Sequence, residues 1–541
     1  MSFSDLSARY YPGHDPEINW PLARYLPPVR GGIWSAWLKA NLPPGSWILD
    51  PLGSHPALAI EAARAGYRVL TTINNPILSF LLDVLARNPA REDFQAALVE
   101  LADSRRGDDR METHIQSLYM TLCPGCDQAL PAQAYLWARD AEMPYARVVK
   151  CPRCGFNGEA PVTDYDLGRL ALSGRDALHR SRAIERIGPA DEPQREAVGE
   201  ALKTYAPRPL YALTTLINKV DALALPAAKR QLAQALLISV CDAANTLWPV
   251  AGGRSRPRQL GIPPQYRENN LWLALENAVN ELSSVASSIS ITTWPDLPAP
   301  TGGICLFAGR ARNLLPLPKE IKPGAVMLLF PRPNQAFWML SALWAGWIWG
   351  RDAVQPMRSV LDRKHYDWYW QTYAFHSALA ALVRNLGAET RWFGVIPELT
   401  PGLLLSSLTA THCAGLELTG MALEAEESII QLSWSPAGAS RPSGRKPDVI
   451  YRQAVREALQ KRGEPAAYLP LYTACLTAQA AEKSLPGEIN AVQVDLLSRV
   501  QAQLSTIFSD HGTLVHFPGP SKSGEGGQWW LKGNPETEAP L

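Results

Sequence analysis

Short apolar runs alternate with longer helical patterns near the start of the chain. The segment 46–56 (SWILDPLGSHP) predicts a short buried strand that ends in a turn. A helix is expected over 57–66, a second strand over 67–73, and another helix over 77–86 after the turn residues 74–76. Strand, helix and strand at this spacing indicate a βαβ unit, and therefore a parallel sheet.

The strand pattern returns after a long stretch of mostly helical periodicity over 166–285. Strands are expected at 302–309 and 322–330, and helices from Phe337 onward and over 366–385. Three further strands are expected at 391–398, 415–425 and 428–434. The sequence therefore predicts an α/β protein whose sheet is assembled from two separate parts of the chain.

The domain organisation follows from these patterns. A length of 541 residues suits roughly three to four domains. Residues 435–447 have the composition of a linker, and helices are expected on either side of residue 465 beyond it. The expected units are a first part of the sheet domain (1–115), a cysteine module (116–165), a helical insert (166–290), a second part of the sheet domain (291–435) and a small, mostly helical C-terminal domain (448–541), which could form a winged helix.

Composition and charge narrow the class of protein. Hydrophobic residues make up 46% and charged residues 19%, an ordinary globular balance. The net charge of +1 excludes a strongly basic nucleic-acid scaffold but leaves room for local basic patches. No signal-peptide pattern begins the chain, and the longest charge-free apolar stretch, 336–350, is shorter than the roughly 18 residues of a membrane span. We expect a cytoplasmic protein with no membrane partner.

Four of the eight cysteines form two CxxC pairs, and these carry the most specific chemical signal. Cys123 and Cys126 precede Cys151 and Cys154 by a spacing typical of a zinc ribbon, in which four thiolates surround one Zn²⁺. Disulfides are the alternative, but they are rare in a cytosolic chain. Four protein ligands leave no open position, so the predicted zinc is structural. The remaining cysteines stand in apolar surroundings and are expected to be buried: Cys241, Cys305, Cys413 and Cys475.

The first strand and its turn resemble a known family. The run 48–54 (ILDPLGS), followed by a helix and by a strand that ends near Asn75-Pro76, resembles the first motifs of class I S-adenosylmethionine-dependent methyltransferases. It is most similar to DNA amino-methyltransferases that carry an inserted zinc ribbon. The resemblance implies a Rossmann-like methyltransferase sheet that is interrupted by the ribbon and the helical insert. It implies S-adenosylmethionine contacts from Asp50, Pro51, Gly53, Ser54, Asn74 and Asn75.

The cofactor motif departs from the family at two places. The two glycines of the family's Gly-x-Gly turn fall on Ser54 and Pro56, with Gly53 one position early. The acidic residue that holds the ribose hydroxyls falls on Ile73, with Asn74 beside it as a neutral substitute. An isoleucine side chain cannot accept a hydrogen bond, so the resemblance implies weakened cofactor binding.

The catalytic motif of the family departs further. In amino-methyltransferases a strand ends in Asp/Asn/Ser-Pro-Pro-Tyr/Phe; the polar residue receives the target amino group, and the aromatic residue stacks on the flipped base. Here the strand 325–330 is followed by Pro331, Arg332, Pro333 and Asn334. Pro333 and Asn334 occupy catalytic motif positions, but the polar acceptor has become Pro331 and the aromatic has become Asn334.

Several features leave two interpretations open. His55 is either an ordinary surface-loop histidine, which the sequence favours, or a local functional substitution. Trp338 belongs either to a helix core or to a base-stacking surface, and the stretch 362–370 suits either phosphate contact or a partly exposed helix start. The basic residues of 440–464, Arg441 included, suit either a solvated helix face or phosphate contact.

Three functions are compatible with these residues. The first is a DNA-methyltransferase-like protein with weakened or lost catalysis, a pseudoenzyme that binds nucleic acid or assists an assembly. The second is an active amino-methyltransferase on DNA or RNA, and the third is a non-catalytic protein scaffold. The expected partners are DNA or RNA and proteins of a modification or defence system. All three depend on the strands near Trp47 and Val326 lying side by side in one sheet.

Overall fold

The protein is described from a computed structural model. The described residues are 6–16, 20–172, 176–187, 194–250, 256–283, 287–363, 365–438, 443–519 and 526–533. Arg441 and part of the expected linker lie outside them.

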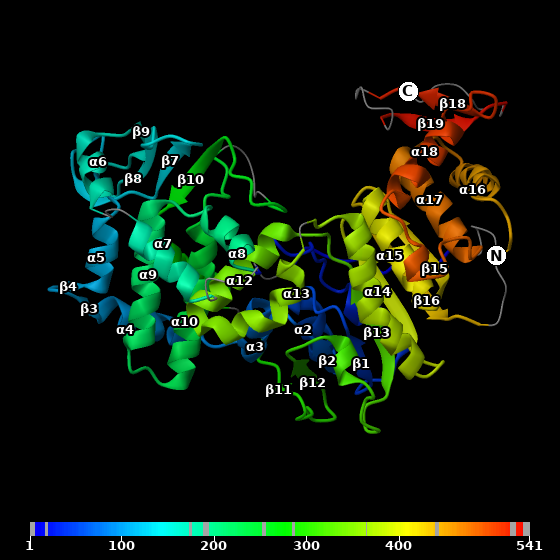
Figure 1. The fold of residues 1–541 in the computed structure, drawn as a ribbon, viewed down its shortest axis with the longest axis horizontal. Coiled ribbons are helices and arrows are strands. Elements are labelled where there is room, and N and C mark those ends of the chain that lie inside the picture. The colour runs from blue at the N-terminus through cyan, green and yellow to red at the C-terminus, as the bar shows by residue number, and fades with distance from the viewer. Residues whose placement is uncertain are drawn as a thin grey trace.

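A mixed eight-stranded sheet lies at the centre of the molecule (Figure 1), in the order β11-β12-β2-β1-β13-β14-β16-β15. The six strands from β11 to β14 run parallel, whereas β16 pairs antiparallel with both β14 and β15. The strands are β1 (Trp47–Asp50), β2 (Arg68–Thr72), β11 (Ile291–Thr293), β12 (Gly303–Phe307), β13 (Pro323–Leu329), β14 (Arg391–Ile396), β15 (Leu416–Glu424) and β16 (Ile429–Pro436). The chain is therefore a mixed α/β protein.

The two strands on which the sequence argument depends are neighbours. β1 pairs in parallel with β13, and Leu49 lies opposite Val326. The prediction that these strands share one sheet is confirmed. All four residues of β1 are buried, which explains why the strand appears in the sequence as an unbroken apolar run and not as an alternating pattern.

Helices cover both faces of the sheet, and alternate residues of each strand face opposite cores. Ile48 and Met327 belong to a core that includes residues of α1, α2, α3 and α12, whereas Leu49 and Val326 belong to a core that includes residues of α14 and α15. These helices are α1 (Ile33–Asn41), α2 (Pro56–Arg64), α3 (Pro76–Arg87), α12 (Gln335–Trp349), α14 (Trp368–Asn385) and α15 (Pro401–Cys413). The apolar stretch at 336–350 is a buried core helix, as predicted.

The cysteine module forms its own small sheet at one end of the molecule (Figure 1), in the order β10-β7-β8-β9. β10 lies near the end of the helical insert in sequence, and it pairs with β7 of the cysteine module. This strand pairing joins the cysteine module to the helical insert. The strands here are β3 (Arg105–Arg106), β4 (Asp109–Arg110), β5 (Met120–Leu122), β6 (Ala129–Pro131), β7 (Ala134–Ala138), β8 (Ala146–Lys150), β9 (Asn157–Pro161) and β10 (Gln265–Asn269). Arg208 of the insert and Glu268 of β10 form a buried ion pair at 2.5 Å.

The helical insert continues the core of the sheet. Leu213 and Leu236 of the insert belong to the same apolar cluster as Leu81 of α3. Arg24, close to the N-terminus, forms a buried ion pair of 3.0 Å with Asp242 of the insert. The helices of this region are α4 (Arg91–Asp103), α5 (Met111–Ser117), α6 (Asp164–Ala171), α7 (Ala177–Glu185), α8 (Gln194–Leu202), α9 (Pro207–Ala222), α10 (Ala227–Ala243) and α11 (Leu271–Leu282).

The C-terminal unit lies at the opposite end of the molecule from the cysteine module (Figure 1). It contains α16 (Pro447–Arg462), β17 (Ala466–Ala467), α17 (Tyr468–Ala481), α18 (Leu496–Phe508), β18 (Leu514–Phe517) and β19 (Gln528–Leu531). Its three strands form an antiparallel sheet in the order β17-β19-β18. Short helical segments elsewhere are η2 (Ala311–Leu314), η3 (Arg351–Met357), α13 (Arg358–Leu361) and η4 (Ile489–Ala491).

None of the helices within the described residues combines the length and the apolar character that a bilayer span requires.

Candidate functional site

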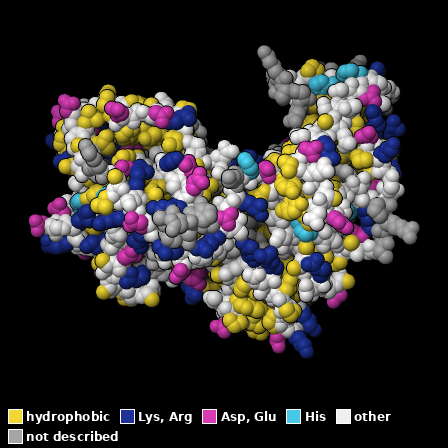
Figure 2. Space-filling model, in the orientation of Figure 1, with side chains coloured by type: hydrophobic (Ala, Val, Ile, Leu, Met, Phe, Trp, Pro, Cys, Tyr) yellow, Lys and Arg dark blue, Asp and Glu magenta, His cyan; other side chains and the backbone are white. Residues whose placement is uncertain are grey.

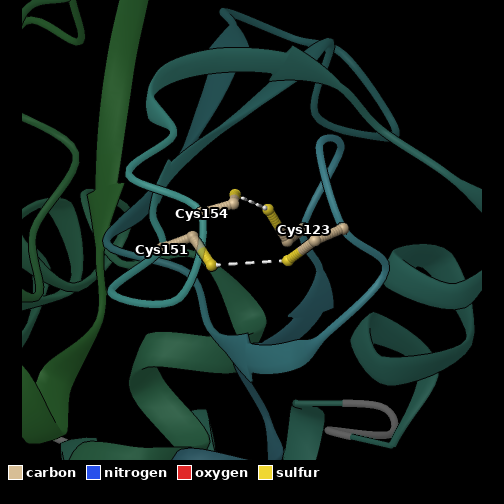
Figure 3. Close-up of side chains that lie close together, drawn as sticks. Cys123, Cys151 and Cys154 are labelled. Atoms are coloured by element: carbon tan, nitrogen blue, oxygen red, sulfur yellow. Dashed lines mark hydrogen bonds between the residues drawn. The ribbon is translucent and has the colours of Figure 1, made fainter.

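The four clustered cysteines meet at one point, as the sequence predicted (Figure 3). The Sγ atoms of Cys123 and Cys154 are 3.5 Å apart, and those of Cys126 and Cys151 are 3.7 Å apart. All four Sγ atoms lie within 4.8 Å of one another. A tetrahedral metal with metal–sulfur bonds of about 2.3 Å needs sulfur atoms about 3.8 Å apart. The four cysteines can therefore hold a metal ion.

The backbone around the cluster favours thiolates. The amide of Gly125 donates to Cys123 Sγ at 3.4 Å. Backbone N–H groups of Cys154 and Arg153 lower the pKa of the Cys151 thiol to about 7, although burial opposes them. The apolar cluster around the sulfurs is small, with Leu130 and Val149 as its only buried aliphatic members in the described chain. A bound metal would thus supply much of the stability of the folded module.

The turn after β1 is shaped by Asp50. Its carboxylate is 1% exposed and accepts hydrogen bonds from the amide of Gly53 and the hydroxyl of Thr71, both at 3.0 Å. Burial raises the pKa of Asp50 to about 6, although these hydrogen bonds act against the rise. The two carboxylate oxygens are thus occupied by the turn and by the neighbouring strand β2.

Gly53 and Ser54 hold this turn against the neighbouring strands. Gly53 has a φ of 47°, and a Cβ added there would lie 2.3 Å from the carbonyl oxygen of Thr72. The Ser54 hydroxyl donates to the carbonyl of Leu329, at the end of β13, at 2.7 Å. The turn therefore ties the carboxyl ends of β1, β2 and β13 together.

His55 is buried, so the expectation of a surface histidine was wrong. The side chain is 3% exposed, and its Nδ1 accepts from the Ala57 amide at 3.0 Å, which makes it the N-cap of α2. Burial, and then the charge of Arg256, lower the pKa of His55 to about 3. Because Pro56 has no N–H and His55 already binds Ala57, the start of α2 offers fewer amides to an anionic ligand than an uncapped helix start would.

The end of β2 lacks an acidic residue, as the sequence indicated. Ile73 lines the cavity beside the turn, as do Asn74 and Asn75. The Asn75 Oδ1 caps α3 by accepting from the amides of Ile77 and Leu78. Asn75 is 1% exposed, and its Nδ2 finds no hydrogen-bond partner among the described residues. It is therefore an unused donor in the cavity wall.

The polar groups after β13 are committed to structure. The Asn334 Oδ1 accepts from the Phe337 amide at 2.9 Å, and its Nδ2 donates to the Tyr25 carbonyl at 3.0 Å. The carbonyl of Pro331 accepts from Gln371 at 2.8 Å. Pro333 is absent from the described residues that line the cavity. The Asn334 side-chain oxygen is therefore already used, and the Pro333 side chain has no acceptor for a target amino group.

A cavity of about 500 Å³ connects these residues. It lies at the carboxyl ends of β1, β2, β12 and β13, and α12 and α14 contribute to its walls. The sequence did not single out Arg310 and Arg312, which follow β12, or Tyr373 of α14, whereas Trp370 ends the stretch 362–370, for which phosphate contact was one interpretation. For the two arginines, the one signal in the sequence was that the predicted strand ends at residue 309, directly before them.

Comparison of the chain with models of known protein families, with curated proteins and with solved structures found no match.

Proposed function

We propose that the chain is a DNA-methyltransferase-like protein that has lost methyl transfer and acts as a nucleic-acid-binding component. The observation that carries this proposal is the position of two altered motifs. Residues 50–56 follow β1 and residues 331–334 follow β13, and these two strands are parallel neighbours. In doubly wound sheets, ligands bind beyond the carboxyl ends of the strands at such a point.

The order of the strands supports a Rossmann-like methyltransferase sheet. The run β12-β2-β1-β13-β14 follows the order 3-2-1-4-5 of doubly wound sheets. Beyond it, β16 lies antiparallel between β14 and β15, so β15 again runs in the direction of the first six strands. This resemblance concerns the sheet and leaves activity to be argued from the site.

The chemistry of the site argues against transfer. The side chain of Asn334 and the carbonyl of Pro331 already have partners within the protein. Arg332 places a cation beside the position where an amino group would have to lose a proton, and Glu398 offsets it at 3.0 Å. The proposal therefore assigns the cavity no methyl-transfer step.

We propose that the cysteine cluster binds Zn²⁺ in a structural role. Four thiolates suit tetrahedral zinc and leave no position for a reacting water. The ion would stabilise the module that β10 joins to the helical insert.

The C-terminal unit supports the nucleic-acid part of the proposal. Its order of helix, strand, helix, helix, strand and strand, with β19 between the other two strands, is that of a winged helix. In such units the helix in the position of α18 enters the major groove. The exposed face of α18 carries Arg499, Gln503 and Thr506, side chains that can bond to phosphates and base edges. Figure 2 shows the molecule hollowed between this unit and the opposite lobe.

The loss of transfer is tested by calorimetric titration with S-adenosylmethionine. The zinc-loaded full chain should give no saturable heat up to about millimolar ligand, because the acidic ribose contact is absent and α2 is capped by His55. Saturable binding together with transfer of a labelled methyl group to DNA would overturn the proposal and restore the active-enzyme alternative.

Nucleic-acid binding is tested by gel shift with duplex DNA at two salt concentrations. Wild-type protein should bind, and its affinity should fall as salt rises. The double variant Arg499→Glu/Gln503→Glu should bind about tenfold more weakly. Lys319→Glu, an exposed change in the loop before β13, is the matched control and should bind as wild type. If wild-type protein binds no DNA or RNA, the scaffold alternative replaces the proposal.

A further inference from the structure

The cavity at the carboxyl ends of the sheet has an unusual balance of charge for the ligand that its family resemblance implies. Arg310, Arg312, Arg332 and Arg363 line it, and none of the described lining residues is Asp or Glu. S-adenosylmethionine carries a net positive charge near neutral pH, since its sulfonium and ammonium groups outnumber its carboxylate. A cavity with four arginines repels such a ligand and attracts an anion.

The arginines differ in how far the protein neutralises them. Arg332 has Glu398 at 3.0 Å, so its charge is partly offset. Arg310 hydrogen-bonds to the neutral hydroxyl of Ser359, and burial followed by the nearby charge of Arg312 lowers its pKa. Arg310 and Arg312 therefore form a pair of like charges whose mutual repulsion a phosphate would relieve.

The rest of the wall suits a flat aromatic group. Trp338 of α12 and Trp370 and Tyr373 of α14 line the cavity and are only half-buried, so part of each ring is accessible. Aromatic faces of this kind stack on nucleobases. Asn75 also lines the cavity, and its unpartnered Nδ2 is buried directly behind this wall. A volume of about 500 Å³ falls within the range of small-molecule sites.

We propose that this cavity binds a nucleoside phosphate, with the phosphate against Arg310 and Arg312 and the base against the aromatic wall. The inference shares one premise with the proposed function, namely that the cavity does not bind S-adenosylmethionine. The same chemistry is presented by a free nucleotide and by the phosphorylated end of a nucleic-acid strand, and the experiment separates these two sources.

The test is calorimetric titration of the zinc-loaded full chain with AMP, ATP, adenosine and S-adenosylmethionine. AMP or ATP should bind saturably and at least tenfold more tightly than adenosine, because adenosine lacks the phosphate. A short oligonucleotide with and without a 5′-phosphate forms the second arm. A preference for the phosphorylated strand over the free nucleotides identifies a strand end as the source, and the reverse preference identifies a free nucleotide.

Variants connect the binding to the proposed residues. Arg310→Gln/Arg312→Gln should weaken binding of the nucleoside phosphate at least tenfold, whereas Arg351→Gln, an exposed arginine outside the cavity lining, should not. Asn75→Asp keeps an oxygen to cap α3 but replaces the Nδ2 donor with negative charge, so it should also weaken binding. Thermal unfolding and zinc content, unchanged from wild type, verify that each variant is folded.

Besides a complete absence of nucleotide binding, three results would overturn the inference. They are equal binding of adenosine and AMP, nucleotide affinity that is unchanged in the Arg310→Gln/Arg312→Gln protein, and tighter binding of S-adenosylmethionine than of any nucleotide. If no nucleotide or phosphorylated strand end binds the cavity while duplex DNA still shifts through α18, this inference fails and the proposed function stands. If nucleotides bind but DNA does not, the proposed function fails and this inference stands.

Discussion

At the scale of single residues, the turn after β1 combines two titratable groups whose pKa values are displaced in opposite directions. Burial raises the pKa of Asp50 to about 6 and lowers the pKa of His55 to about 3. Both are consequences of a turn that excludes water and satisfies its hydrogen bonds internally. The polar groups of this turn therefore bond mainly within the protein itself.

Asp50 should make the protein's stability depend on pH. Its folded pKa of about 6 lies above the ordinary value of 3.8, so the unfolded chain loses this proton first as pH rises. Stability from this group is therefore fully present below pH 3.8 and is lost as pH rises through 6. In wild-type protein the free energy of unfolding should fall by about 1–3 kcal/mol across this pH window, and in Asp50→Asn protein this fall should be absent.

Urea unfolding of both proteins at several pH values measures this effect. All other titrating groups are common to the two proteins, so the difference between their curves reports Asp50. Parallel curves would show that the carboxyl group ionises as freely in the folded state as in the unfolded one.

Gly53 should tolerate no side chain. Gly53→Ala places a Cβ 2.3 Å from the Thr72 carbonyl oxygen in a left-handed conformation, and we expect a loss of about 2 kcal/mol or more. Gly66→Ala is the matched control, since its φ of 89° is also left-handed but nothing lies within 4 Å. It should cost about 1 kcal/mol. Equal losses in the two proteins, measured by chemical denaturation, would contradict the close approach at Gly53.

At the scale of elements, burial decided which helices and strands the sequence could predict. β1 begins with three consecutive apolar residues and β2 is buried from Val69 to Thr72, because both faces of the sheet are covered, and the two strands were predicted within one or two residues. Helix α15 was missed because nearly all its residues are buried, small hydroxyl side chains included, so it has no amphipathic period. Helix α4 was missed because only a narrow face of it is apolar.

The candidate site was predictable to a similar extent. Spacing alone identified the cysteine cluster, because CxxC pairs are local in sequence. The turn residues were placed correctly, but their use in capping and bridging depends on contacts such as Ser54 with Leu329, hundreds of positions apart. Arg310 and Arg312 lie at the cavity because β12 is placed beside β2 in the sheet. No local sequence pattern predicts this order of strands.

The cysteine module should depend on its metal. Cys151→Ser should reduce zinc from about one ion per chain to nearly none and should abolish amide-exchange protection in β8 and β9. Protection in β1 and β2 should persist, because the apolar clusters that contain those strands are separate from the small cluster around the sulfurs. Cys413→Ser is the control: its thiol donates to the Pro486 carbonyl, a contact that serine can also make. Retained zinc in Cys151→Ser protein would contradict the four-ligand site.

At the scale of the whole molecule, the helical insert and the sheet share one core. Arg24 joins them through Asp242 at 3.0 Å, the Leu247 carbonyl at 3.0 Å, and the Tyr25 and Asn245 side chains. The insert therefore contributes to the stability of the sheet, in addition to extending from it.

Arg24→Met should destabilise the insert and the sheet together. Removing the guanidinium leaves the buried Asp242 without its cation, and we expect a loss of about 3–5 kcal/mol. Hydrogen exchange should accelerate in α10 and in β2 alike. Acceleration confined to α10 would show that the insert unfolds as a separate unit.

The hydroxyl of Ser54, bonded across to the end of β13, has a further consequence for how a ligand would arrive. Because this hydrogen bond joins the ends of β1 and β13, the two strand ends do not move apart or close when a ligand binds. The part of the cavity wall that these two strand ends form is therefore in place before a ligand arrives. We then expect the association and dissociation rates of a ligand to depend on the width of the cavity opening and on long-range electrostatic attraction. No movement of these two strand ends would have to precede binding.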